Sequence, residues 1–170
     1  GGSGVGLLIG SPGSGKTLLC QLLTSDLSDE LQTVTLAHCH SAVTRRELLQ
    51  SVLFGLELPY RGMDEGELRL SLLDYLKRGA DPEWAMLLVV DEAHQLLPAV
   101  LEELRMLGDI NVDGKPRVRL LLSATASLEE ALAAPSLEGF NQRIACRSYL
   151  ESLDLGETRG YVAAKIRSAG

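Results

Sequence analysis

Gly10-Ser-Pro-Gly-Ser-Gly-Lys-Thr17 is the stretch of this 170-residue sequence that decides the fold. It satisfies the pattern G-x-x-x-x-G-K-[ST], in which a glycine-rich loop follows a strand and opens a helix. The flanking residues supply that context, because Val5–Ile9 is a short apolar run and leucines recur at helical spacing from Lys16 to about Leu27. We therefore predict a phosphate-binding turn between a buried strand and a helix.

The residue types in this turn predict its chemistry. Three glycines let the backbone N–H groups turn inward around an anion, and the helix adds the positive end of its dipole. We expect Lys16 to bridge the β- and γ-phosphates of a nucleotide and the Thr17 hydroxyl to coordinate Mg²⁺. A glycine-rich strand–helix turn without a ligand is the alternative. The predicted phosphate-binding residues are Gly10, Ser11, Pro12, Gly13, Ser14, Gly15, Lys16, Thr17 and Leu18.

A second apolar run, Leu87–Val90, ends in two carboxylates, Asp91 and Glu92. Open α/β sheets bind ligands at the carboxyl ends of their strands. We expect Asp91 to hold magnesium through water and Glu92 to act as the general base toward an attacking water. Two solvated acids at a strand end are the alternative, but the glycine loop favours the catalytic interpretation. Because the sequence has no N-K-x-D motif for guanine, the predicted ligand is ATP rather than GTP.

Five apolar runs alternate with helical patterns along the chain. Capping boxes at Thr44 with Glu47, at Ser127 with Glu130 and at Asp154 with Glu157 predict three of the helix starts. Strands that alternate with helices imply a parallel sheet covered on both faces, so the expected fold class is α/β. We find no domain boundary and treat residues 1–170 as one domain. The predicted strands are Val5–Ile9, Thr33–His38, Met86–Val90, Val118–Ser123 and Ile144–Leu150.

Composition narrows the function classes. The chain is 45% hydrophobic and 23% charged, which is typical of a globular domain and excludes disorder. A formal charge of −7 argues against binding nucleic acid mainly through a basic surface. The longest uncharged apolar run, Ala85–Val90, is far too short to span a membrane. Three widely spaced cysteines fit a reducing compartment, so we expect a cytoplasmic domain.

The residue pattern around the histidines predicts neither a metal site nor a catalytic role. His38 and His40 flank Cys39 at the end of a predicted strand, where alternation would separate the cysteine from the two histidines, so no metal cluster is expected. His94 follows the acid pair and could couple nucleotide state to movement. We expect it to be a surface histidine in a first helical turn.

Two segments resemble the AAA+ ATPases. The segment 87–107, LLVVDEAHQLLPAVLEELRML, is similar to the second nucleotide-binding motif of the branch that holds the bacterial type II secretion component A (ExeA-like) and transposition-helper (TniB-like) proteins. The segment 140–170, FNQRIACRSYLESLDLGETRGYVAAKIRSAG, is similar to the end of that branch's ATPase core. The resemblance implies a three-layer P-loop fold, a five-stranded parallel sheet with strand order 5-1-4-3-2, and hydrolysis of ATP to ADP and phosphate.

The same resemblance implies roles for further residues. Thr125 aligns with the polar residue that senses the γ-phosphate, and Arg143 aligns with the arginine finger that reaches into a neighbouring subunit's site. His40 aligns with a polar residue that can hold the catalytic glutamate inactive until a partner binds. AAA+ proteins continue into a helical lid, which here would begin after Gly170. We therefore expect weak nucleotide binding and little turnover from this piece alone.

A second resemblance competes with the first. The segments GSGKT, DEAH and Ser123-Ala124-Thr125 resemble the first three ATPase motifs of the DEAH-type helicases. The residues between Lys16 and Asp91 resemble none of the nucleic-acid-contacting motifs of those helicases. The AAA+ resemblance is therefore preferred.

These resemblances imply three functions. The first is an ATP-driven switch that assembles or remodels a secretion or envelope complex. It would use Mg²⁺, self-associate through the nucleotide site, bind a protein partner and form the cytoplasmic part of a membrane-anchored protein. The second is a transposition-regulator ATPase bound to duplex DNA, and the third is a helicase motor fragment.

Overall fold

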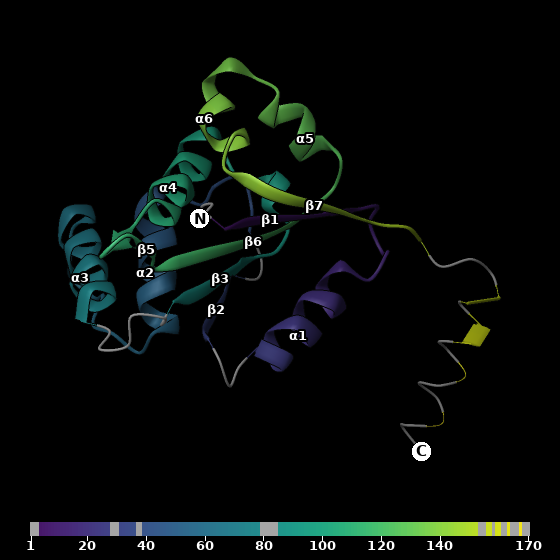
Figure 1. The fold of residues 1–170 in the computed structure, drawn as a ribbon, viewed down its shortest axis with the longest axis horizontal. Helices are drawn as coiled ribbons and strands as arrows, with labels where there is room; N and C mark the ends of the chain where they lie inside the picture. Colours follow the sequence, from purple (N-terminus) through teal and green to yellow (C-terminus); the bar gives the residue numbers. More distant parts are fainter. Residues whose placement is uncertain are drawn as a thin grey trace.

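The computed structural model describes residues 4–27, 31–36, 39–78 and 85–152, together with 156–157, 159–160, 163 and 167. Within these residues a five-stranded sheet forms the centre of the molecule, and helices cover both of its faces (Figure 1). This is the three-layer α/β architecture that the sequence predicts. None of the helices in the described ranges is long and apolar enough to cross a bilayer.

The central sheet is parallel and has the strand order β2-β3-β6-β1-β7. These five are the predicted strands, and counted without the two short strands β4 and β5 their order is 5-1-4-3-2, as the AAA+ resemblance implied. β2 ends at Leu36, and His38, where we expected it to end, lies outside the described residues. The strands are β1 Val5–Gly10, β2 Gln32–Leu36, β3 Met86–Val90, β6 Val118–Ala124 and β7 Ile144–Leu150.

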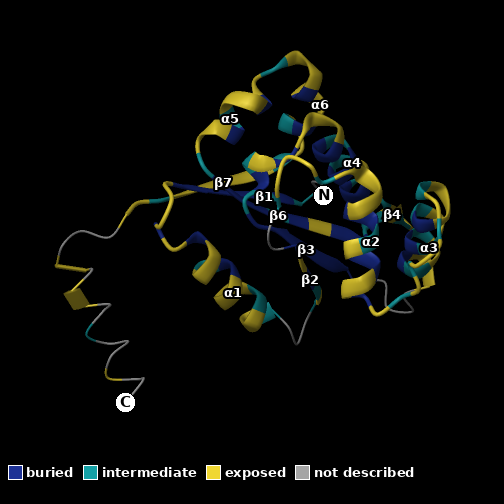
Figure 2. Cartoon of the chain, turned by 180° about the vertical axis from the view of Figure 1, so that it is seen from behind, coloured by how far each residue is buried: buried dark blue, intermediate teal, exposed yellow. Residues whose placement is uncertain are grey.

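The helices form two apolar layers with the sheet. In β1, Val5, Leu7 and Ile9 join the cluster that contains the buried faces of α2, α3 and α4, whereas Leu8 packs with Cys20 of α1. Successive strand residues point to opposite faces, so one strand contributes to both layers. Figure 2 shows β1, β3 and β6 largely buried, whereas the edge strand β7 and the outer helix faces are exposed. The helices are α1 Lys16–Leu27, α2 Arg45–Gly55, α3 Glu65–Arg78, α4 Pro98–Gly108, α5 Ser127–Leu132 and α6 Glu138–Asn141, with 3₁₀ turns η1 Ala93–Gln95 and η2 Pro135–Leu137.

Of the three predicted capping boxes, the one at Thr44 is present, and Asp154 of the third lies outside the described residues. The N–H of Glu47 donates to Thr44 Oγ1 at 3.2 Å, and the N–H of Thr44 donates to the Glu47 carboxylate at 2.8 Å. The prediction at Ser127 with Glu130 is wrong, because Ala126 precedes α5 and provides no side-chain cap. Ser127 instead shares a hydrogen bond with Thr125, which occupies its hydroxyl before the helix begins.

An ion pair joins α3 to α4. The Glu103 side chain is fully buried, and its two oxygens accept hydrogen bonds from Arg69 Nε at 3.0 Å and Nη2 at 2.7 Å. These hydrogen bonds raise the pKa of the Arg69 guanidinium above its usual range. A bidentate pair of this kind satisfies a carboxylate that would otherwise be costly to bury.

A short hairpin, β4 (Asn111–Val112) with β5 (Lys115–Pro116), was not predicted. Its two turn residues, Asp113 and Gly114, have φ angles of +53° and +78°. Asp-Gly is a favoured pair for such two-residue turns. The strands are too short to produce a detectable hydrophobic alternation, so the turn was the only signal.

Candidate functional site

The loop between β1 and α1 owes its shape to its glycines. Gly13 and Gly15 have φ angles of +80° and +92°, which residues with a side chain rarely adopt. Gly10 is required for space, because a Cβ there would meet Ser14 Oγ at 2.5 Å and the carbonyl oxygen of Leu150 at 2.9 Å. At each of the three glycines predicted for the phosphate-binding turn, a side chain would therefore be strained or would clash.

Lys16 begins α1, and its side chain folds back over the loop. The residue is buried, and Nζ donates to the carbonyl oxygens of Gly10 and Ser11, both at 2.9 Å. An ammonium has three donors, so one remains for an anion in the loop. Ser14 Oγ is buried in the same loop without a partner among the described residues. A buried unpaired hydroxyl is unfavourable, and a phosphate oxygen would satisfy it.

The strand order brings the acid pair to this loop. β6 lies between β1 and β3, so the carboxyl ends of these three strands are neighbours. Thr17 Oγ1 donates a hydrogen bond of 2.6 Å to Asp91 Oδ2. A hydroxyl and a carboxylate so placed are the hard oxygen ligands that Mg²⁺ takes together with substrate phosphates.

Glu92 holds a strained position directly after Asp91. Its backbone is left-handed, with φ +56° and ψ +35°, a conformation that is costly for a residue with a side chain and recurs at functional sites. Its N–H donates to Asp91 Oδ1 at 3.0 Å, so the backbone of Glu92 and the Thr17 hydroxyl fix the two oxygens of Asp91 between them. The Glu92 side chain is 42% exposed, which leaves its carboxylate accessible to water.

Thr125 follows β6 and lies between the loop and the acid pair. Its N–H donates to His94 Nδ1 at 3.3 Å, and its Oγ1 shares a hydrogen bond of 2.8 Å with Ser127 Oγ. The His94 side chain is only 15% exposed, and its Nε2 lies 3.5 Å from Glu92 Oε2. The prediction of a surface role for His94 is therefore wrong, because this histidine lies between Thr125 and Glu92.

Arg143 lies away from this cluster. It precedes β7, which pairs with β1 from Val5 opposite Ile144 to Gly10 opposite Leu150. Arg143 is therefore at the amino ends of the strands, about 20 Å of strand length from the loop. Its Nη2 lies 3.3 Å from Asp109 Oδ1, and its side chain is 46% exposed. The structure does not bring it to the site of its own chain, and its role toward a neighbouring subunit stays a prediction.

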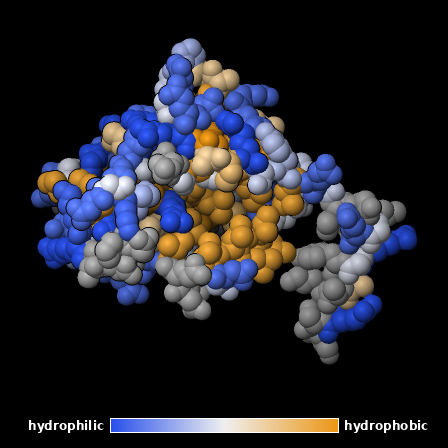
Figure 3. All heavy atoms as spheres, viewed as in Figure 1, coloured by the Kyte–Doolittle hydropathy of each residue, from blue (hydrophilic) through white to orange (hydrophobic). Residues whose placement is uncertain are grey.

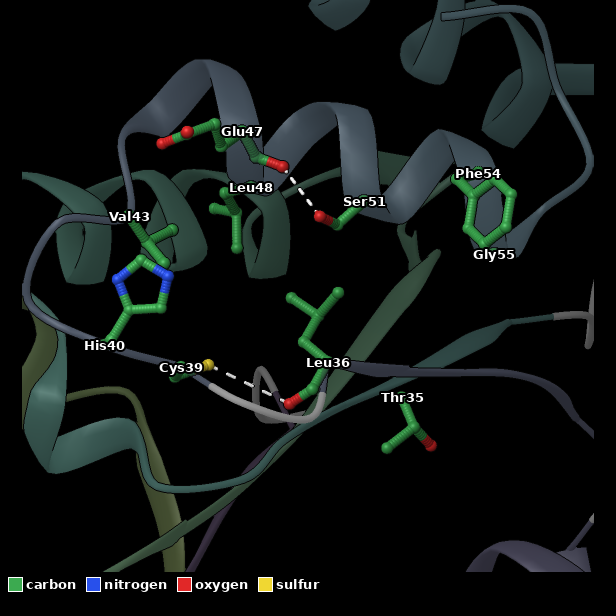
Figure 4. A pocket seen from close by; sticks show the side chains of 10 residues that line it. All are labelled: Thr35, Leu36, Cys39, His40, Val43, Glu47, Leu48, Ser51, Phe54 and Gly55. Atoms are coloured by element: carbon green, nitrogen blue, oxygen red, sulfur yellow. Dashed lines mark hydrogen bonds between the residues drawn. The ribbon is translucent and has the colours of Figure 1, made fainter.

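His40 also lies outside the cluster. It lines a groove of about 540 Å³ between β2 and α2, together with Val43 and Glu47 (Figure 4), and its Nδ1 accepts a hydrogen bond from the N–H of Ala42 at 3.3 Å. The histidine that lies against Glu92 is His94. The role implied for His40 therefore stays a prediction that this geometry does not favour.

A cavity of about 330 Å³ opens beside the phosphate loop. Its apolar wall comes mainly from α1, where Leu22 is 55% exposed. Figure 3 shows hydrophobic side chains gathered on the face of the molecule that carries α1. An apolar wall next to a phosphate-binding loop suits the flat face of a base. The cavity is lined by Gly13, Ser14, Gly15, Leu18, Leu19, Leu22 and Leu150.

The residues of this cluster fit a magnesium-bound nucleoside triphosphate. Lys16 and Ser14 have donors to offer to phosphate oxygens, and Thr17 and Asp91 offer oxygen ligands. Within the described residues, no group of three or more His, Cys, Asp or Glu side chains could hold a metal ion. A cation here would therefore complete its coordination with phosphate oxygens and water, as Mg²⁺ commonly does.

The parallel sheet, its strand order and the loop between β1 and α1 define the core of a P-loop nucleoside triphosphatase. Residues 1–132 match the family model described as AAA domain, and the chain belongs to this family. It is similar to the General secretion pathway protein A of Aeromonas hydrophila, with 32% identity over 171 residues. That match covers 99% of this chain and 31% of the relative. The family match favours the AAA+ resemblance over the helicase one.

Solved structures agree on the fold. The ORC2 protein of Aeropyrum pernix, in its ADPNP-ADP complexes, has a TM-score of 0.70 and 21% identity, covering 95% of this chain and 45% of that one. The A. pernix ORC1 protein in complex with DNA has a TM-score of 0.72 and 17% identity, covering 97% of this chain and 44% of that one. The chain thus spans less than half of each of these relatives.

Proposed function

We propose that this chain binds ATP with Mg²⁺ at the loop between β1 and α1 and hydrolyses it to ADP and phosphate. The contact of 2.6 Å between Thr17 and Asp91 carries the proposal, because it joins the phosphate loop to the acid pair across the end of β6. Membership of the AAA domain family supports a nucleotide ligand.

The proposed roles follow from position. Lys16 and the loop N–H groups bind the β- and γ-phosphates, while Thr17 and Asp91 hold Mg²⁺, which neutralises charge on the phosphate oxygens when bound. Glu92 accepts a proton from the water whose oxygen attacks the γ-phosphorus as the bond to the bridging oxygen breaks. Thr125 senses the γ-phosphate from the end of β6.

Turnover by the protein, with a matched pair of variants, tests this proposal. Glu92→Gln should retain ATP binding but lose hydrolysis by about 100-fold or more, because the general base is gone. Glu138→Gln, which changes an exposed carboxylate on α6, should leave both unchanged. Full turnover in Glu92→Gln would show that Glu92 is not the general base.

Self-association through the nucleotide site is part of the proposal. Arg143 is half exposed and lies at the sheet edge opposite the loop, so it could act only on another subunit's nucleotide. Mass in solution should rise with a non-hydrolysable ATP analogue. Arg143→Ala should slow turnover, whereas Arg147→Ala, which removes a partner of Glu129, should not. If the protein stayed a monomer under all conditions, Arg143 could not act on the nucleotide of a neighbouring subunit.

For the biological role, we propose an ATP-driven step in assembling a secretion or envelope complex, carried out on the cytoplasmic side. The similarity to General secretion pathway protein A supports this, although the chain covers only 31% of that relative. A DNA-associated role is the second candidate, because the A. pernix ORC1 structure contains DNA. The net charge of −7 disfavours it. Stimulation of turnover by duplex DNA, lost at high salt, would select the DNA role.

A further inference from the structure

His94 lies between two parts of the site that are far apart in sequence. It belongs to η1, which follows the acid pair after β3, and its ring reaches the residue that follows β6. With 15% of its side chain exposed, the ring is nearly buried there. One ring nitrogen accepts a hydrogen bond from the N–H of Thr125, and the other lies 3.5 Å from a carboxylate oxygen of Glu92.

The contact with Thr125 indicates which nitrogen of the neutral ring carries the proton. Nδ1 accepts the hydrogen bond from the N–H of Thr125 at 3.3 Å, so the ring proton belongs on Nε2. Nε2 lies 3.5 Å from Glu92 Oε2, and its N–H is therefore available to that carboxylate. The ring connects the backbone at the end of β6 to the side chain of Glu92.

Each end of this connection has one further contact. The left-handed backbone of Glu92 is held by the bond from its N–H to Asp91, which restricts where its side chain can go. On the other side, Thr125 Oγ1 is bonded to Ser127 Oγ at the start of α5. His94 is thus the side chain by which a displacement at the end of β6 can reach the Glu92 carboxylate.

We propose that His94 is a positioning residue for hydrolysis, which couples the direction of the Glu92 carboxylate to the Thr125 loop. This rests on the proposed function, in which Glu92 is the base and Thr125 lies near the γ-phosphate. His94 does not touch the nucleotide in this proposal. Through its two contacts, a shift of the chain at the end of β6 changes the direction in which the Glu92 carboxylate points.

Three substitutions in the full-length protein separate the two contacts. His94→Asn keeps an acceptor near the Nδ1 position but cannot reach Glu92, and His94→Gln keeps a donor near the Nε2 position but loses the Thr125 contact. His94→Phe removes both. The control is Gln95→Asn, since Gln95 is the exposed neighbour of His94 in η1. All three His94 variants should lower kcat about tenfold or more, the usual loss for groups that orient a functional side chain, with ATP affinity and KM unchanged.

Losses of ATP affinity or of folding that parallel the loss of kcat would assign His94 a structural role and overturn the proposal. Unchanged kcat in His94→Phe would overturn it as well. Failure of the proposed function would give a different result. In that case the unsubstituted protein would show no ATP turnover, or its turnover would persist in Glu92→Gln.

A second readout does not depend on turnover. The imidazole ¹⁵N spectrum, assigned with His94→Asn, should show a proton on Nε2 of His94 and none on Nδ1. Glu92→Gln should shift the Nε2 resonance. A non-hydrolysable ATP analogue with Mg²⁺ should shift it in the unsubstituted protein. A proton on Nδ1, or an Nε2 resonance indifferent to Glu92→Gln, would show that the connection does not exist.

Discussion

Thr17 Oγ1 donates a 2.6 Å hydrogen bond to Asp91 Oδ2, although the two residues are 74 positions apart in the chain. The bond forms because β1 and β3 end at the same edge of the sheet with β6 between them. It unites the two sequence motifs in one cluster.

Removing either partner of that bond should reduce the effect of magnesium on ATP binding. Thr17→Val and Asp91→Asn should each weaken Mg²⁺-dependent ATP affinity about tenfold or more, and the double variant should lose little further, because both groups serve one ion. Titration calorimetry with and without Mg²⁺ measures this. Thr24→Val on the exposed face of α1 is the control. Additive losses would show that the two groups act separately.

Glycine substitutions can separate backbone strain from ligand binding. Gly15 and Gly62 have φ angles of +92° and +76°, and a Cβ would meet no atom within 4 Å at either. Alanine should therefore lower stability by about 1–2 kcal/mol at both positions. Only Gly15→Ala should also lower ATP affinity, because Gly62 lies in the loop between α2 and α3. Chemical denaturation and calorimetry on the two variants check this. Equal losses of ATP affinity in the two variants would argue against phosphate binding by the loop that contains Gly15.

Much of the site could be predicted because its residues are close in sequence. The loop from Gly10 to Thr17 and the acid pair after β3 are local patterns, each set by a strand end and a turn. The meeting of the two depends on strand order, which no local pattern contains. That order came from the AAA+ resemblance.

The contacts of His94 could not be predicted from its neighbours. Its position depends on the loop after β6, and a histidine following two acids carries no sign of which loop it will contact. The capping prediction at Ser127 failed for a similar reason. The hydroxyls of Thr125 and Ser127 bond each other, and the helix starts after Ala126 without them.

The buried carboxylate of Glu103 predicts a large stability effect. Arg69→Met leaves Glu103 buried without its cation and should cost about 2–4 kcal/mol, at the lower side of the range for buried pairs because Arg69 is partly exposed. Arg78→Met removes an exposed pair with Asp74 on the same helix and should cost less than about 0.5 kcal/mol. Urea denaturation measures both. Similar values for the two variants would contradict the burial argument.

The three free cysteines should react in a definite order. Burial, reinforced by the negative charge of Asp91, raises the pKa of both the Cys20 and Cys39 thiols to about 11. Near pH 8 only about one in a thousand such thiols is the reactive thiolate, and raising the pH toward 11 should increase their rates. Cys146 is exposed and should be alkylated first by iodoacetamide. Peptide mass spectrometry over time measures the order, and labelling of Cys39 as fast as Cys146 would contradict it.

The central claim is that Lys16 and the loop around it bind the phosphates of ATP. Equilibrium binding of ATP with Mg²⁺, measured by calorimetry on the protein and on Lys16→Ala, tests it most directly, with circular dichroism to confirm that both are folded. We expect Lys16→Ala to lose ATP binding while keeping the fold, because the buried ammonium is gone. Equal affinity in the two folded proteins would contradict the account.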